Sequence, residues 1–151
     1  MRLWRLTPKE TIEKAFNGEG AKKYGGRWNR KGTPLVYLAS SLSLCALETL
    51  VHTDSDLFPA HYYYTVDVPE DSLISDLEVP LPDGWETTPG PDLLQEIGTN
   101  WFESKKSPLL RVPSAVIPQE FNYLLNPTHA DFDKLSIGKP QIFKFDPRLE
   151  S

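Results

Sequence analysis

The chain has 151 residues, of which 39% are apolar and 11% aromatic, as expected for one globular domain. Its formal net charge of −5 argues against a nucleic-acid-binding protein, because such domains usually carry a basic surface. The only cysteine, Cys45, leaves no partner for an intrachain disulfide and no cysteine pair for a zinc site. We therefore expect a single domain over residues 1–151 that binds neither a metal nor nucleic acid directly.

The amino terminus and the lengths of the apolar runs indicate where in the cell the protein is expected. The opening residues, MRLWRLTPKE, lack the apolar core of a signal peptide. No apolar run approaches the length of a membrane span. These features predict a cytoplasmic protein that has no membrane partner.

The start of the chain predicts a strand, a short helix and a loop. Residues 2–6 (RLWRL) alternate as in a strand. Thr7 is then a candidate helix cap, with Pro8 at the first helical position and Glu10 three residues after the cap. We expect this helix to end near residues 17–18, followed by a Gly- and Lys-rich loop over residues 18–24.

Residues 24–52 (YGGRWNRKGTPLVYLASSLSLCALETLVH) hold the main candidates for a functional site. Gly25 and Gly26 permit a close backbone approach immediately before Arg27. Several lysines and arginines cluster around this turn. A local basic patch on an acidic protein suits a small anionic ligand such as a dinucleotide, although a solvated lysine-rich turn has the same composition.

A short apolar strand is predicted at Pro34–Ala39, after a Gly-Thr-Pro turn signal. This turn makes residues 27–30 plausible antiparallel neighbours of the strand. The strand carries one tyrosine, Tyr37, which is expected to share a face with Leu35, whereas Val36 and Leu38 face the other way.

An apolar helix is predicted next, capped by Ser40 or Ser41. Its apolar residues surround almost the whole helix, which predicts a buried element. One acid, Glu48, interrupts them, and an acid there is costly to bury without a partner. The partner is either Arg27, in a structural ion pair, or a ligand.

The rest of the chain predicts more strands than helices. A loop follows at residues 53–56, and a proline-rich connection with one short strand near residues 73–74 fills residues 69–90. Strands are expected at His61–Val68, Phe121–Leu125 and residues 141–146, and a helix at residues 91–104. The strand-like run Pro108–Ile117 is broken at Pro113, so Ser114 at the break is expected to face a cleft. The balance is an α+β domain with a strand-rich centre and three or four helices.

The chain resembles the RES-domain toxins of bacterial toxin–antitoxin pairs, a family named for an arginine, a glutamate and a serine. The matching segments are GGRWNRKGTPLVYLASS, ALETLVH and VPSAVIPQEFNYLLNPTHADF. On this match Arg27, Glu48 and Ser114 take the three named positions, and Tyr37 falls at the family's strand tyrosine. The resemblance covers nearly the whole chain.

The resemblance implies a fold similar to that of ADP-ribosyltransferases and an attack on NAD. It implies that NAD is a substrate with no prosthetic group present, and that the partner is a helix-turn-helix (Xre-type) antitoxin. Glu48 would stabilise a cationic ribose or bind a ribose hydroxyl, Arg27 would hold the pyrophosphate, and Tyr37 would stack on nicotinamide. Ser114 would either contact a ribose or position its neighbours. Tyr24 and Asn122 are further candidates for contacting NAD.

The resemblance leaves several questions open. The acceptor of the ADP-ribosyl group is either a small molecule, water or phosphate, or a target protein. A non-catalytic module with a structural Arg27–Glu48 pair is the remaining alternative. The sequence does not fix the oligomeric state, so a homodimer stays open.

Overall fold

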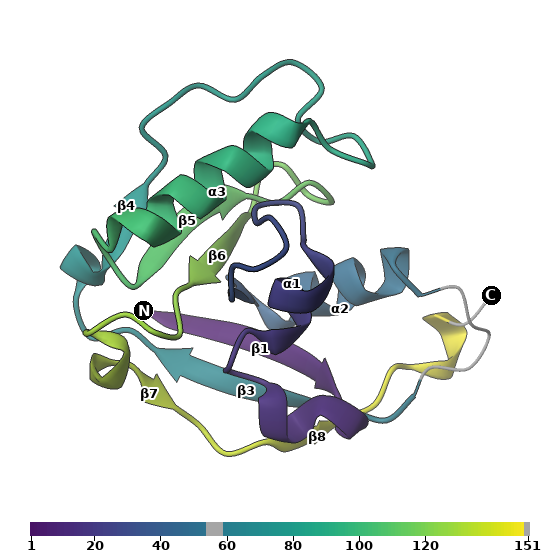
Figure 1. The fold of residues 1–151 in the computed structure, drawn as a ribbon. Helices are drawn as coiled ribbons and strands as arrows, with labels where there is room; N and C mark the ends of the chain where they lie inside the picture. Colours follow the sequence, from purple (N-terminus) through teal and green to yellow (C-terminus); the bar gives the residue numbers. More distant parts are fainter. Residues whose placement is uncertain (54–58, 150–151) are drawn as a thin grey trace.

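The computed structural model describes residues 1–53 and 59–149, so part of the loop predicted at residues 53–56 lies outside the described residues. The strands form one sheet in the order β4-β5-β6-β2-β1-β3-β7, and β8 also pairs with β3 (Figure 1). All pairings are antiparallel except β4 with β5. The strands are β1 (Arg2–Pro8), β2 (Val36–Ala39), β3 (His61–Asp67), β4 (Ile74–Asp76), β5 (Leu109–Pro113), β6 (Phe121–Leu125), β7 (Ser136–Ile137) and β8 (Gln141–Phe143).

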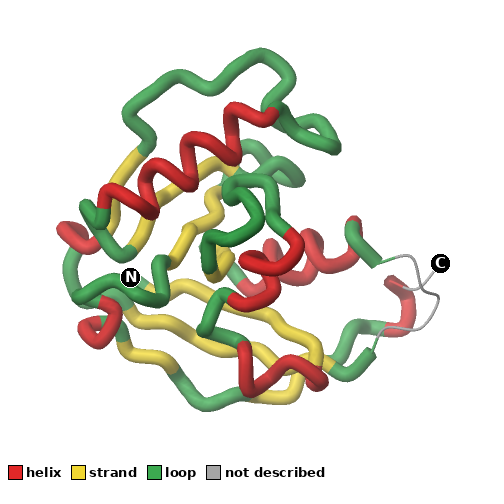
Figure 2. Tube along the Cα trace, viewed as in Figure 1, coloured by secondary structure: helices red, strands yellow, loops and turns green. Residues whose placement is uncertain are grey.

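Three α-helices and four 3-10 helices connect the described strands, as Figure 2 shows by colour. The α-helices are α1 (Glu19–Tyr24), α2 (Leu42–Val51) and α3 (Asp92–Ser104). The 3-10 helices are η1 (Lys9–Lys14), η2 (Asp71–Leu73), η3 (Phe132–Lys134) and η4 (Pro147–Leu149). The predicted α+β class is therefore confirmed.

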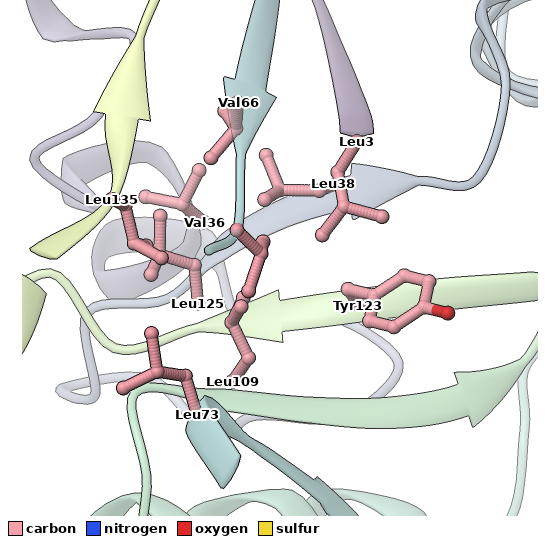
Figure 3. Packing of buried hydrophobic residues seen from close by; sticks show 10 residues of the cluster. Leu3, Val36, Leu38, Val66, Leu73, Leu109, Tyr123, Leu125 and Leu135 are labelled. Carbon is pink, nitrogen blue, oxygen red and sulfur yellow. The ribbon is translucent and has the colours of Figure 1, made fainter. Parts of the chain in front are cut away.

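The sheet curls, so that side chains from distant strands meet on its inner face. Leu3 of β1, Val66 of β3, and Val36 and Leu38 of β2 pack there against Leu125 of β6 (Figure 3). All five side chains are almost completely buried. Burial of a leucine or valine side chain contributes about 1.5–3 kcal/mol, so this cluster is a main source of stability.

The other face of the sheet is covered by α3, which packs over β5 and β6, and by α2, which packs on β1 and β2. Leu35 lies at one end of this face, in a cluster with Leu94 and Trp101 of α3. Ala39 lies at the other end, in a cluster with Leu44 and Cys45 of α2. The predicted division of strand 34–39 into two faces is thus confirmed. Strand 34–39 contacts the α3 cluster at its start and the α2 cluster at its end.

Four expectations about local structure are wrong. Residues 19–24 form helix α1, because Asn17 accepts from the Glu19 N–H at 3.0 Å and starts the turn. The first helix is 3-10, and its cap is Pro8, since Thr7 remains in β1. Residues 27–30 do not pair with β2, because β1 and β6 occupy both edges of β2.

Helix α2 is also more exposed than its apolar sequence predicts. It packs on the sheet through one side only, so Leu47 keeps 41% and Val51 59% of their surface exposed. Its predicted start is confirmed, because the Ser41 hydroxyl accepts a hydrogen bond from the Leu44 N–H at 3.1 Å. The tertiary arrangement, and not the sequence pattern, therefore decides which side of α2 is covered.

No helix within residues 1–53 and 59–149 has the length and apolar character needed to cross a membrane.

Candidate active site

A cleft of about 830 Å³ opens between α2 and the start of α3. Its lining includes Tyr37 of β2 and Asn122 of β6, which come from the strands beneath the two helices. Glu48 of α2 lies on one side and Asp92 of α3 on the other. The cleft is lined by Gly26, Arg27, Trp28, Tyr37, Glu48, Val51, His52, Glu86, Thr88, Pro89, Gly90, Asp92, Gln95, Ala115, Val116 and Asn122.

Glu48 is held at this cleft because α2 is anchored one turn earlier. The buried Leu44 precedes it by four residues, so both side chains lie toward the sheet side of the helix. Burial raises the pKa of Glu48, while hydrogen bonding by Asn122 and Ser114 and the charges of His52 and Arg27 lower it. Desolvation is the largest of these effects, so the hydrogen bonds and nearby charges offset only part of the cost of burying the carboxylate.

Ser114 is a fully buried support for Glu48. Its Oγ lies 2.9 Å from Glu48 Oε1 and accepts from the backbone N–H groups of Val116 and Ile117, each at 3.1 Å. Because two N–H groups point at this oxygen, its own O–H is directed to the carboxylate. Ser114 therefore orients Glu48 from behind and, unlike the expectation, does not itself face the cleft.

The hydroxyl of Tyr37 is fully engaged within the protein. It donates to Asn29 Oδ1 at 2.5 Å and accepts from the Trp28 N–H at 3.2 Å. Asn29 is itself completely buried, and its amide donates to the carbonyls of Ala21, Arg30 and Thr33. Burial also raises the pKa of the Tyr37 phenol. Only the ring is thus left for a ligand.

Arg27 faces the cleft but does not pair with Glu48. Its Nη1 donates to the carbonyls of Trp85 and Thr87, at 3.0 and 2.8 Å, and its Nη2 donates to Thr88 Oγ1 at 3.2 Å. Among the described residues, no salt bridge involves Glu48. The structural Arg27–Glu48 pair that the sequence left open is therefore not formed.

Comparison with known proteins decides the family. The family model described as "RES domain" matches residues 2–146. The chain belongs to the RES-domain family. It is 41% identical over 152 residues to "Toxin Res" of Yersinia enterocolitica, covering 99% of this chain and 100% of the relative. It is 43% identical over 152 residues to "Toxin Res" of Photorhabdus laumondii, covering 99% and 97%.

Two further matches extend the comparison. A protein of Sphingobium sp. named "Prs ADP-ribosylating toxin" is 39% identical over 153 residues, with 97% of this chain and 95% of the relative covered. The solved Mycobacterium tuberculosis MbcT-MbcA toxin–antitoxin complex contains a chain with a TM-score of 0.72 and 21% identity. That match covers 99% of this chain and 86% of the other, and it shows a shared fold.

The remaining candidates of this RES domain lie in different places. Asn122 lines the cleft beside Glu48. Tyr24 ends α1, is 70% exposed and has the Lys23 ammonium 5.2 Å from its ring centroid. Among the described residues, Tyr24 is not one of those that line the cleft.

Sequence reasoning missed the part of the cleft formed by α3 and the loop before it. Gln95 lines the cleft and donates to the Gly26 carbonyl at 2.9 Å, which ties α3 to the turn carrying Arg27. Glu86, Thr88 and Gly90 come from the proline-rich connection, where no motif singles them out. His52 was identifiable only as a helical neighbour of Glu48, four residues further on.

Proposed function

We propose that this RES-domain toxin cleaves NAD at the bond between nicotinamide and ribose and thereby depletes cellular NAD. The observation that carries the proposal is Glu48, a partly buried carboxylate that is held at the cleft by neutral partners. Such a group provides negative charge where a cation develops. The cleft volume of about 830 Å³ is also within the range of known ligand sites.

In the proposed reaction the C1′–N bond breaks and its electron pair leaves with nicotinamide, which departs neutral. The ribose is left with oxocarbenium character, as in glycoside hydrolysis. The Glu48 carboxylate stabilises that cation or holds a ribose hydroxyl beside it. The oxygen of water or phosphate then bonds to C1′, and water releases one proton to the solvent.

Other cleft residues would bind the substrate. Arg27 has five N–H donors, of which three are used within the protein, so two remain for the pyrophosphate. The Tyr37 ring offers an apolar face for nicotinamide. The Asn122 amide donates to the Leu38 carbonyl at 3.4 Å, and its hydrogen bonding lowers the pKa of Glu48. Because it lines the cleft, it is placed to contact the ribose.

A second candidate is transfer of ADP-ribose to a protein. It is favoured by the 39% identical relative, whose name is that of an ADP-ribosylating toxin. The same bond breaks and the same carboxylate acts, but a side chain of the target takes the place of water or phosphate. The two candidates differ in where the ADP-ribosyl group is found after the reaction.

The test is the release of nicotinamide from NAD by the purified protein and by Glu48→Gln. The substitution keeps size and hydrogen-bonding capacity but removes the charge, so we expect release to fall by roughly 10²-fold. Glu103→Gln, an exposed position on α3, is the matched control and should keep the parental rate. A folded Glu48→Gln protein that cleaves NAD at the parental rate would refute the proposal.

The ADP-ribosyl acceptor is identified in the same assay with adenine-labelled NAD. In buffer alone, label in free ADP-ribose indicates hydrolysis, and label in ADP-ribose 1-phosphate indicates phosphorolysis. Label that becomes acid-precipitable only when a bacterial lysate is added indicates transfer to protein. The parental protein and Glu48→Gln are compared in both settings.

We also propose that a cognate antitoxin, of the helix-turn-helix type implied by the resemblance, neutralises this chain in the cytoplasm. The support is a shared fold with a chain of a toxin–antitoxin complex. Expression alone should stop growth, and co-expression should restore it. An antitoxin that binds but leaves NAD turnover unchanged would contradict occlusion of the cleft as the means of neutralisation.

A further inference from the structure

The segment between β4 and α3 contributes one wall of the cleft but has little regular structure. Residues 77–91 contain neither helix nor strand, and Figure 1 shows this connection extending away from the sheet before it returns to the start of α3. Glu86, Thr88, Pro89 and Gly90 from this segment line the cleft. The position of this wall therefore depends on a few contacts with the rest of the protein.

Arg27 makes three of those contacts. Its guanidinium donates to the carbonyls of Trp85 and Thr87 and to the hydroxyl of Thr88. The Trp85 side chain adds an apolar contact with the cluster beneath α3. Within the segment itself, Thr87 is bonded to Gly84 through both its N–H and its hydroxyl, at 3.1 and 2.8 Å. The turn is thus locally closed and is attached through Arg27 to the turn that follows α1.

We infer that Arg27, besides its proposed contact with the pyrophosphate, positions this wall, and that residues 85–90 contribute to the affinity for the dinucleotide because Arg27 holds them in place. This inference rests on the proposed function. Charged hydrogen bonds to carbonyls are stronger than neutral ones, so one guanidinium is enough to fix a short turn. Residues 85–90 then lie at one side of the bound substrate, away from Glu48.

Gly90 is the position that makes the attachment possible. A Cβ added there would lie 2.7 Å from Arg27 Nη1, which is closer than such atoms approach in proteins. The backbone of Gly90 does not have a positive φ, so alanine is allowed on conformational grounds. Gly90→Ala therefore pushes the guanidinium away from the turn and leaves the chemistry of Arg27 itself unchanged.

The first experiment measures amide hydrogen exchange of residues 84–90 in the ligand-free protein. Gly90→Ala should accelerate exchange of the Trp85 and Thr87 amides by roughly ten-fold, equivalent to about 1.4 kcal/mol of lost protection. Gly20→Ala is the matched control, because a Cβ at Gly20 would meet nothing within 4 Å. Thermal melting of each variant verifies that the domain remains folded.

A double-mutant cycle shows whether the effect passes through Arg27. Arg27→Ala alone should also accelerate exchange of these amides. Adding Gly90→Ala to Arg27→Ala should then change little further, since the closest colliding group is absent and the next neighbour, Leu94 Cδ1 at 3.3 Å, is the end of a flexible side chain. Additive effects of the two substitutions would overturn the inference, as would exchange in Gly90→Ala equal to that in Gly20→Ala.

The second experiment measures steady-state kinetics with NAD. Gly90→Ala should raise KM by roughly ten-fold and leave kcat within about two-fold, because the wall lies away from Glu48. Faster exchange with an unchanged KM, or a loss confined to kcat, would overturn the role of the wall in affinity. If the parental protein neither binds nor cleaves NAD, the proposed function fails and so does this second half, while exchange still decides the role of Arg27.

Discussion

Ser114→Ala tests whether this serine acts on Glu48 or on a substrate. The substitution deletes a completely buried Oγ that makes three hydrogen bonds, one to Glu48 Oε1 and two from backbone N–H groups. At about 1 kcal/mol for each bond, we expect a loss of about 3 kcal/mol in the free energy of unfolding. For a domain of this size, that corresponds to a decrease in Tm of roughly 6–12 °C.

The same substitution should change the pH dependence of catalysis. The Ser114 hydrogen bond lowers the pKa of Glu48, so its removal leaves burial less opposed and raises that pKa further. The acid limb of kcat/KM for nicotinamide release should therefore move to higher pH, with activity partly recovered above it. Ser43→Ala, at an exposed position on the same helix, should shift neither Tm nor the pH profile appreciably.

Calorimetry and a pH–rate series on the same preparations decide the question. A Ser114→Ala protein with the parental Tm that has lost activity at every pH would refute the argument. That result would mean that the hydroxyl touches the substrate and has no role in holding the carboxylate.

Three other substitutions have directions that follow from the contacts. Tyr37→Phe should cost about 1–3 kcal/mol in denaturant unfolding, because the Asn29 Oδ1 and the Trp28 N–H lose their partner; unchanged stability would contradict this. Glu48→Gln should melt higher than the parent at pH 8, and the difference should shrink toward pH 4. The pKa of Glu48 is raised in the folded protein above the ordinary value of 4.5, so the parent loses stability as the pH rises from 4.5 through the folded pKa. A difference in Tm that does not depend on pH would exclude this linkage. Arg5→Lys should lower Tm, since the largely buried guanidinium bridges two carbonyls that an ammonium does not span, and an unchanged Tm would disprove the bridge.

Local sequence signals predicted the elements that position Glu48 and Tyr37. The Ser41 cap and strand β6 (Phe121–Leu125) were both identified, because caps and alternating strands depend on neighbouring residues. The division of strand residues between two faces was also correct. The exposure of α2 was not predicted, since it depends on how much of the helix the sheet covers.

The opposite side of the cleft could not be read from the sequence. The contacts of Arg27 join it to Trp85, Thr87 and Thr88, which follow it by 58, 60 and 61 positions and lie in a segment without a motif. Asn29 gave no signal either, although its completely buried amide holds both the turn and the Tyr37 hydroxyl. In both cases the partners are backbone carbonyls or the hydroxyl of a residue elsewhere in the chain. A sequence pattern does not predict these partners, because every residue has a carbonyl and the fold decides which one is in reach.

Arg27 and Glu48 have opposite charges and are kept apart at this cleft, and this separation suits the proposed substrate. A cation paired with Glu48 would stabilise the carboxylate but would also cancel its field at the cleft. Neutral donors, the Ser114 hydroxyl and the Asn122 amide, orient the carboxylate and leave its charge available. Arg27 is meanwhile held by carbonyls of the loop, with two donors still free. NAD has the matching polarity, since its nicotinamide–ribose end is positive and its pyrophosphate negative, so one orientation of the dinucleotide places each end beside the charge that stabilises it.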